Sequence, residues 1–141
     1  YELDRGYVLW VKGKKNRIYT DIDLSFGFNA FSGDINKKLD VNAVKQSIKT
    51  LLLTQSGEKP FHPEIGSPLY GLLFENMRPG METVISSRIQ DVVTAFEPRC
   101  KMKVVETQAD YDNNTYNVSM FFHVVGINEP QSMHMELKRL R

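Results

Sequence analysis

A carboxylate and a guanidinium lie two positions apart in the stretch TAFEPRCKMKVVE (residues 94–106), as Glu97 and Arg99 on either side of Pro98. Proline disfavours helical geometry at the residue before it, so Glu97 should be extended and both side chains should point the same way. Such a pair can transfer protons, hold a local helix end, or contact another protein. The planar fork of arginine suits two-bond contacts with carboxylate, which favours recognition over proton transfer.

Other carboxylates offer weaker candidates for chemistry. Four glutamates are scattered near predicted helix ends: Glu58, Glu64, Glu75 and Glu97. Two of them converging in space would allow a paired-carboxylate glycosidase, but their spacing selects no pair. Asp21 and Asp23 share one face of a predicted strand and invite a metal interpretation, although hard cations usually gather more oxygen ligands than two.

The sequence lacks the motifs of several enzyme classes. No cysteine or histidine spacing suits zinc, no glycine loop would cradle phosphate, and there is no Gly-x-Ser-x-Gly elbow. The histidines His62, His123 and His134 lie in three different predicted elements. Cys100 is the only cysteine, so no disulfide can form within the chain, and we expect a small buried residue at a strand start. We therefore expect no catalytic residue, no metal and no cofactor.

Three helices are predicted to position these residues. Asp40 is expected to cap a helix over residues 41–52, and a Ser-Pro pair begins a short helix over residues 68–77. Apolar residues follow helical spacing most clearly over residues 81–96. This third helix runs directly into Glu97.

Alternating apolar and polar residues predict the strands. Residues 18–28 have this pattern and should form a strand with one buried face, followed by a polar loop over residues 30–40. Three further strands are expected within residues 100–104, 116–124 and 133–139, and the first two flank a polar turn suited to an antiparallel hairpin. The last strand ends in lysine and arginine, which are typical of a sheet edge.

Together these elements predict an α+β fold, with three helices packed on one face of a small, mainly antiparallel sheet. The length predicts a single domain over residues 1–141, with residues 1–17 as an N-terminal extension. The chain has 18 basic and 17 acidic residues, a net charge of +1, so neither nucleic acid nor a membrane is an expected partner. No apolar run approaches the roughly 18 residues that a spanning helix needs.

Several stretches, in this order and spacing, are similar to one family. They are DIDLSF (residues 21–26), GDI (33–35), VNAVKQSIKTLLLTQSGEKPFHPEIGSPLYGLLFE (41–75) and EPR (97–99). Together they resemble the baseplate wedge, sheath-initiator family of contractile phage tails, most of all its T-even-like members. A homologous component occurs in type VI secretion baseplates. The resemblance covers roughly residues 18–125.

The resemblance implies a structural, non-enzymatic protein of the virion tail baseplate, assembled in the host cytoplasm. In that family the protein joins the wedge core bundle to the first ring of the tail sheath and initiates sheath assembly. Glu97, Pro98 and Arg99 are then implied to contact the core bundle of neighbouring wedge proteins. The C-terminal sheet is implied to accept strands from sheath subunits. Tail tube or hub proteins are further expected partners.

One family member has also been described as a lysozyme. The alternative function is therefore a peptidoglycan-cleaving glycoside hydrolase. The residues of this sequence add no support to that alternative.

Overall fold

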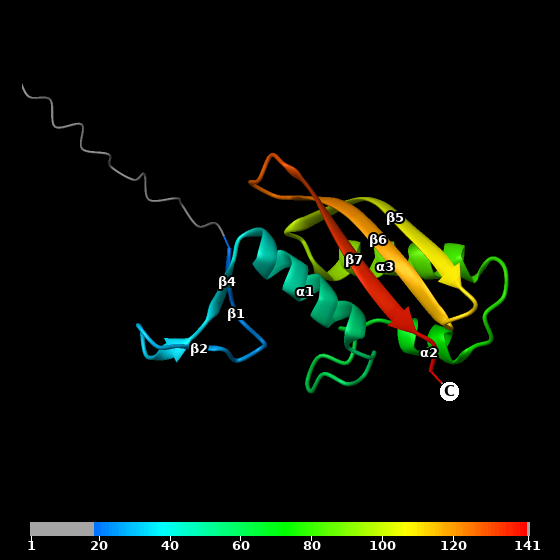
Figure 1. Ribbon diagram of the computed structural model, residues 1–141, viewed down its shortest axis with the longest axis horizontal. Helices are drawn as coiled ribbons and strands as arrows, with labels where there is room; N and C mark the ends of the chain where they lie inside the picture. The colour runs from blue at the N-terminus through cyan, green and yellow to red at the C-terminus, as the bar shows by residue number, and fades with distance from the viewer. Residues whose placement is uncertain (1–18, 141) are drawn as a thin grey trace, which may run out of the picture.

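The computed structural model describes residues 19–140, so the predicted N-terminal extension lies outside the described residues. The elements are, in chain order, β1 (Thr20–Ile22), β2 (Phe28–Asn29), β3 (Asp34–Ile35), β4 (Lys37–Leu39), α1 (Val41–Leu53), α2 (Leu69–Phe74), α3 (Met81–Phe96), β5 (Cys100–Asp110), β6 (Thr115–Val124) and β7 (Pro130–Lys138). Helices α1–α3 and strands β5–β7 form the body of the molecule, and residues 20–39 form an arm at one side of it (Figure 1).

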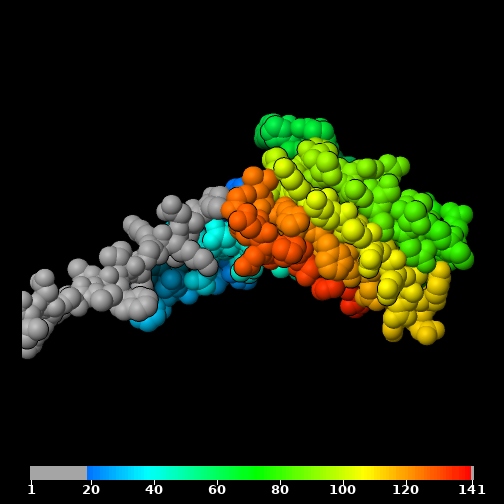
Figure 2. All heavy atoms as spheres, turned by 90° about the horizontal axis from the view of Figure 1, so that it is seen from above, coloured from blue at the N-terminus to red at the C-terminus, as the bar shows by residue number. Residues whose placement is uncertain are grey.

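The body is built on an antiparallel sheet with the strand order β5-β6-β7. Central strand β6 alternates strictly, and its inward side chains are buried: Tyr116, Val118, Met120, Phe122 and Val124. The three strands form a continuous face of the molecule in Figure 2. The predicted hairpin between β5 and β6 and the edge position of β7 are both confirmed.

Helix α3 has the bounds that its apolar spacing predicts, and it packs extensively against β5. Helix α1 packs on α3, β1 and β4, whereas α2 packs on α3 and α1. The fold is therefore α+β with antiparallel sheets, as predicted. The three helices do not form a clear single layer on one sheet face, because only α3 makes extensive contact with the sheet.

Two helix boundaries test the capping predictions. Helix α1 begins after Asp40, as expected, although the Asp40 carboxylate makes no cap bond to the helix and instead accepts a hydrogen bond from the N–H of Tyr19 at 3.4 Å. Helix α2 is shorter than predicted and ends at Phe74. Ser67 is buried, and its hydroxyl accepts a hydrogen bond from the N–H of Leu69 at 3.2 Å, so it stabilises the start of the helix from one position further out.

The arm corrects the prediction for residues 18–28. The described part is not one strand: β1 ends at Ile22, a turn follows, and Phe26 has a φ of 52°, which breaks extended geometry. The predicted loop instead supplies β3 and β4, which pair with β2 and β1. The face predicted to be buried is exposed in this chain, at Ile22, Leu24, Phe26 and Phe28.

A bulge corrects the prediction for β5. The pairing with β6 shifts register between Met102 and Val104. An extra residue in one strand reverses the face that later side chains occupy. Val104, which alternation assigned to the inner face, is therefore exposed, and Val105 is partly buried against the core.

Candidate functional site

The Glu97-Pro98-Arg99 motif forms the turn between α3 and β5. Helix α3 ends at Phe96, the N–H of Glu97 donates to the Val93 carbonyl at 2.9 Å, and the strand resumes at Cys100. The Glu97 side chain is only 4% exposed. Arg99 donates from Nε to Oε1 of Glu97 at 2.7 Å and from Nη2 to Oε2 at 2.9 Å. The two side chains lie on the same side, as predicted, and bind each other through a two-bond contact.

Two residues from distant parts of the chain complete this cluster. Ser47, on α1, donates a hydrogen bond from its hydroxyl to Oε2 of Glu97. Tyr19 stacks under the Arg99 guanidinium, 5.6 Å from the ring centroid, and its hydroxyl donates to the Val125 carbonyl at 2.9 Å. The cluster therefore fastens α1, the α3–β5 turn, the base of the arm and the end of β6 together.

The electrostatics of the cluster keep both charges in place. Burial raises the pKa of Glu97, but hydrogen bonds from Arg99 and Ser47 outweigh it, and the net effect lowers the pKa below its ordinary value. The hydrogen bond to Glu97 raises the pKa of Arg99. A carboxylate held in its ionised form is unsuited to act as a general acid, so this cluster is built for a fixed charge pair rather than for proton transfer.

The other candidate carboxylates do not join this cluster. Glu64 contacts His62 at 3.1 Å, Glu75 accepts from Arg78 at 2.9 Å, and Glu58 accepts from the N–H of Gln55 at 3.0 Å. Each is engaged by a neighbour within three positions along the chain. No two of them share a hydrogen bond or a partner among the described residues.

The metal and thiol candidates also have ordinary surroundings. Asp21 accepts from the N–H of Ile22, while Asp23 accepts from the N–H of Ser25 and lies 3.8 Å from Lys38. Within residues 19–140, no group of three or more metal-ligating side chains converges.

Cys100 is buried, and this burial, together with the charge of Glu97, raises the pKa of its thiol to about 12. None of the helices over this range is long and apolar enough to cross a bilayer.

A groove of about 820 Å³ opens beside the cluster, between the arm and α1. Its apolar lining comes from Ile22, Leu24, Phe26, Leu51, Ile65 and Phe96. Ser47 lies in the groove wall, next to the buried carboxylate. Pro98 is exposed and the Arg99 side chain is 28% exposed. The motif therefore presents Pro98 and part of Arg99 to the outside, while Glu97 is enclosed.

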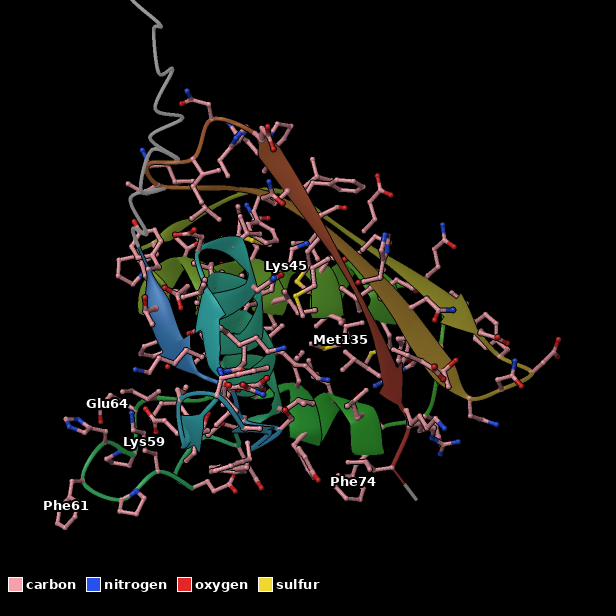
Figure 3. The ribbon with its side chains drawn as sticks, turned by 60° about the vertical axis from the view of Figure 1, so that its left-hand side comes forward. Lys45, Lys59, Phe61, Glu64, Phe74 and Met135 are labelled. Carbon is pink, nitrogen blue, oxygen red and sulfur yellow. The ribbon has the colours of Figure 1, made fainter. Side chains whose placement is uncertain are left out.

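A second exposed feature is the connector between α1 and α2. Phe61 is almost fully exposed at its tip, near Lys59 and Glu64 (Figure 3). The base of this connector is closed where Gln55 bridges to Ser67, and Gly66 there has a φ of 153° and leaves no room for a Cβ against the Gln55 backbone.

Sequence reasoning found Glu97 and Arg99 but missed Ser47 and Tyr19. Ser47 lies 50 positions from Glu97, and Tyr19 lies 106 positions from Val125. The only signal for Ser47 is its position beside the apolar stripe of α1, where a small polar residue faces the interior. No local pattern pointed to Tyr19.

Comparison with known proteins gives consistent results. The family model for baseplate wedge protein gp25 matches residues 39–126. Baseplate wedge protein gp25 of Enterobacteria phage T4 is 32% identical over 110 residues, which span 78% of this chain and 83% of that protein.

Solved structures share the fold. A chain of the anti-feeding prophage baseplate has a TM-score of 0.60 at 20% identity and covers 87% of each chain. A Geobacter sulfurreducens protein, provisionally assigned as a tail lysozyme, has a TM-score of 0.64 at 16% identity over 70% of this chain and 89% of its own. A chain of the type VI secretion baseplate complex has a TM-score of 0.54 at 16% identity over 67% of this chain and 91% of its own.

Proposed function

The chain belongs to the baseplate wedge protein gp25 family and is a structural component of a contractile tail baseplate, and we propose that it connects the wedge core bundle to the tail sheath. The observation that carries this proposal is that one small body has two separate incomplete surfaces. One is the groove beside Glu97-Pro98-Arg99, and the other is the open edge of β7.

The wedge core bundle occupies the first surface in this proposal. The groove has an apolar lining from the arm and α1, which suits the apolar stripe of a partner helix. Phe96, which precedes the motif, and Ser47, which binds Glu97, lie in its wall, and Pro98 and part of Arg99 are exposed. The buried pair with Glu97 holds Arg99 in one orientation, so the contact surface is preformed and its ordering costs little on binding.

Sheath subunits occupy the second surface by strand addition, and the first sheath ring assembles on it. The N–H of Arg139 donates to the Asn114 carbonyl at 2.9 Å, beside the first β6–β7 pair. Main-chain groups alternate direction along a strand, so the N–H groups of His134 and Glu136 point away from β6. These groups are free to pair with an incoming strand, whose hydrogen bonds would not depend on side-chain identity.

The chain works without catalysis in this proposal. A glycosidase needs one carboxylic acid with a raised pKa near a second carboxylate, whereas the pKa values of Glu64 and Glu97 are lowered. The likeness to the Geobacter protein at 16% identity concerns the fold alone. Incubation of the purified chain with peptidoglycan should release no soluble fragments; turnover that scales with the chain and is lost on substitution of one of these glutamates would establish the hydrolase instead.

Two variants test the two surfaces separately in cells that produce the wedge and sheath proteins. Pro98→Ala removes exposed surface without touching the buried pair, and should reduce the recovery of wedge proteins with the tagged chain, whereas Pro79→Ala, at the other end of α3, should not. Glu136→Pro removes an outward N–H and should prevent sheath polymerisation while sparing wedge assembly. Glu136→Ala is its control, because it keeps the N–H. Normal sheath growth on Glu136→Pro baseplates would contradict the strand-addition proposal.

The predicted contacts with tail tube or hub proteins, and assembly in the host cytoplasm, remain predictions. Fractionation of infected or induced cells tests assembly in the host cytoplasm. The chain should be detected there in assembled baseplates before tails are complete. The chain in association with membranes throughout assembly would contradict it.

A further inference from the structure

A second groove, of about 560 Å³, lies among the arm, α1 and Met133 of β7. Leu24, Leu53 and Met133 supply its apolar walls. In Figure 1, β7 is the strand of the sheet nearest to α1. The groove therefore adjoins the open strand edge, on the side of the sheet that α1 borders.

Three lysines line this groove: Lys38, Lys45 and Lys49. Lys45 and Lys49 are one helical turn apart on α1, so they occupy the same side of the helix. Lys45 extends from α1 toward the sheet (Figure 3). The net charge of the whole chain is only +1, so this concentration of positive charge is a local feature.

The lysines are not neutralised from within the groove. Its lining contains no carboxylate, and Lys38 alone has an ion pair, with Asp23 at 3.8 Å. Neither Lys45 nor Lys49 forms an ion pair with any residue between positions 19 and 140. Like charges at this spacing repel, so the arrangement is unfavourable until an anionic group enters.

A strand added to β7 would enter this groove. Adjacent strands lie about 4.8 Å apart, and alternate side chains of the added strand face the same side as Met133. Met133 is an inward-facing residue of β7 and itself lines the groove. The helix-facing side chains of the added strand would therefore meet Lys45, Lys49 and Leu53.

We propose that the strand received by β7 carries carboxylate side chains on its α1-facing side, and that these pair with Lys45 and Lys49 while apolar neighbours on the same side contact Leu53 and Met133. This inference rests on the proposed strand addition and names the chemistry of the partner. Main-chain hydrogen bonds alone select neither a sequence nor a register. Charge pairs with the α1 lysines select both a sequence and a register, because a shift of the added strand by one residue would turn its carboxylates to the opposite face of the sheet.

The test measures binding of purified sheath subunits from the same tail to the full chain immobilised on a sensor. Lys45→Glu/Lys49→Glu is compared with Lys101→Glu/Lys103→Glu, which makes the same charge change on exposed residues of β5. We expect roughly a tenfold or greater loss of affinity for the α1 variant and little change for the β5 variant. Raised salt should weaken wild-type binding and have less effect on Lys45→Gln/Lys49→Gln. Thermal unfolding verifies that each variant folds, and the glutamine variant replaces the charge reversal if the latter does not.

Glu136→Pro separates this inference from the proposed function. If Glu136→Pro abolishes binding and the α1 reversal behaves like the β5 reversal, strand addition stands and the carboxylate pairing is wrong. If Glu136→Pro binds normally, strand addition itself is wrong, and the inference fails with it. If the α1 reversal changes self-association in sedimentation and leaves sheath binding unchanged, the occupant is a second copy of this chain and the inference is overturned.

Discussion

The body and the arm use similar sequence patterns with opposite results. In β6 the alternating apolar residues are buried against the helices, whereas in residues 20–39 the apolar residues of a comparable alternation are exposed. Phe122 is 1% exposed, and Phe28 is 69% exposed. Surface apolar residues scattered singly are normal, but six on one short segment (Ile22, Leu24, Phe26, Phe28, Phe31 and Ile35) indicate a contact surface. In the body the apolar face is covered by the chain's own helices, whereas in the arm it is not, and we expect partner proteins to cover the arm.

The largest expected effect comes from truncating matched phenylalanines in the two regions. Phe122→Ala should lower the free energy of unfolding by about 3 to 5 kcal/mol, because it removes a buried ring and leaves a cavity. Phe28→Ala should change it by less than about 0.5 kcal/mol, because the ring is mostly in water in the free chain. Urea unfolding of both variants measures the difference. Equal losses would break the distinction between body and arm.

The Glu97 cluster joins the two regions, so it should give the next largest effect. Arg99→Ala leaves the buried Glu97 carboxylate without its charged partner, with only the Ser47 hydroxyl and the backbone N–H of residue 99 to donate to it. The substitution should cost about 2 to 3 kcal/mol, toward the low end for a broken buried pair because Arg99 is partly exposed. Loss of assembly in this variant would therefore combine a folding defect with a binding defect.

A matched variant separates these contributions. Glu97→Met/Arg99→Met removes both charges and should recover much of the lost stability, as measured by urea unfolding. A double variant less stable than Arg99→Ala would show that most of the lost free energy of unfolding comes from the charge pair itself and not from leaving the Glu97 carboxylate unpaired.

Acid should release the same cluster. Because the pKa of Glu97 is lowered from its ordinary value of 4.5 on folding, the unfolded chain binds this proton more readily, and stability rises with pH through this range. The contribution is fully present above about pH 5 and is lost as the pH falls through the folded-state pKa.

Urea midpoints of the wild type and Glu97→Gln between pH 6 and pH 3 test this titration. The wild type should lose more stability on acidification than the variant, while the other carboxylates with lowered pKa values, Asp23, Glu64 and Asp110, contribute equally to both. Parallel pH profiles would exclude Glu97 as a source of acid sensitivity.

The smallest effect concerns the only thiol. Cys100 is buried in the body, and its pKa of about 12 keeps it protonated at neutral pH. A thiol reagent at pH 8 should label the folded chain slowly and the urea-unfolded chain rapidly. The free energy of unfolding should stay unchanged until Cys100 is labelled. Rapid labelling of the folded chain would indicate that the start of β5 opens more readily than the rest of the body.

The sequence predicted those elements whose pattern and burial agree. Helix α3 and strand β6 have long, regular apolar spacing that faces the chain's own core, so periodicity alone located them. The end of α3 before Pro98 followed from local sterics, although Glu97, with φ −122° and ψ 81°, leads into a turn rather than extended chain. These predictions needed no knowledge of distant residues.

The failures have identifiable physical causes. Alternation over residues 18–28 was taken to mean burial within the chain, but the pattern does not say which molecule covers the face. The bulge before Val104 shifted a face that strict alternation had assigned inward. The Ser47–Glu97 hydrogen bond joins residues 50 positions apart, so only the folded packing of α1 against α3 brings it about.

Hydrogen exchange of the full chain, free and assembled with its wedge proteins, tests most directly whether the arm is completed by partners. In the free chain, amides of β6 should exchange slowly and those of residues 20–39 rapidly. In the assembled wedge, the arm amides should become protected by about tenfold or more while β6 is unchanged. An arm that is already as protected as β6 in the free chain, or that gains no protection on assembly, would contradict the division between a self-sufficient body and a partner-dependent arm.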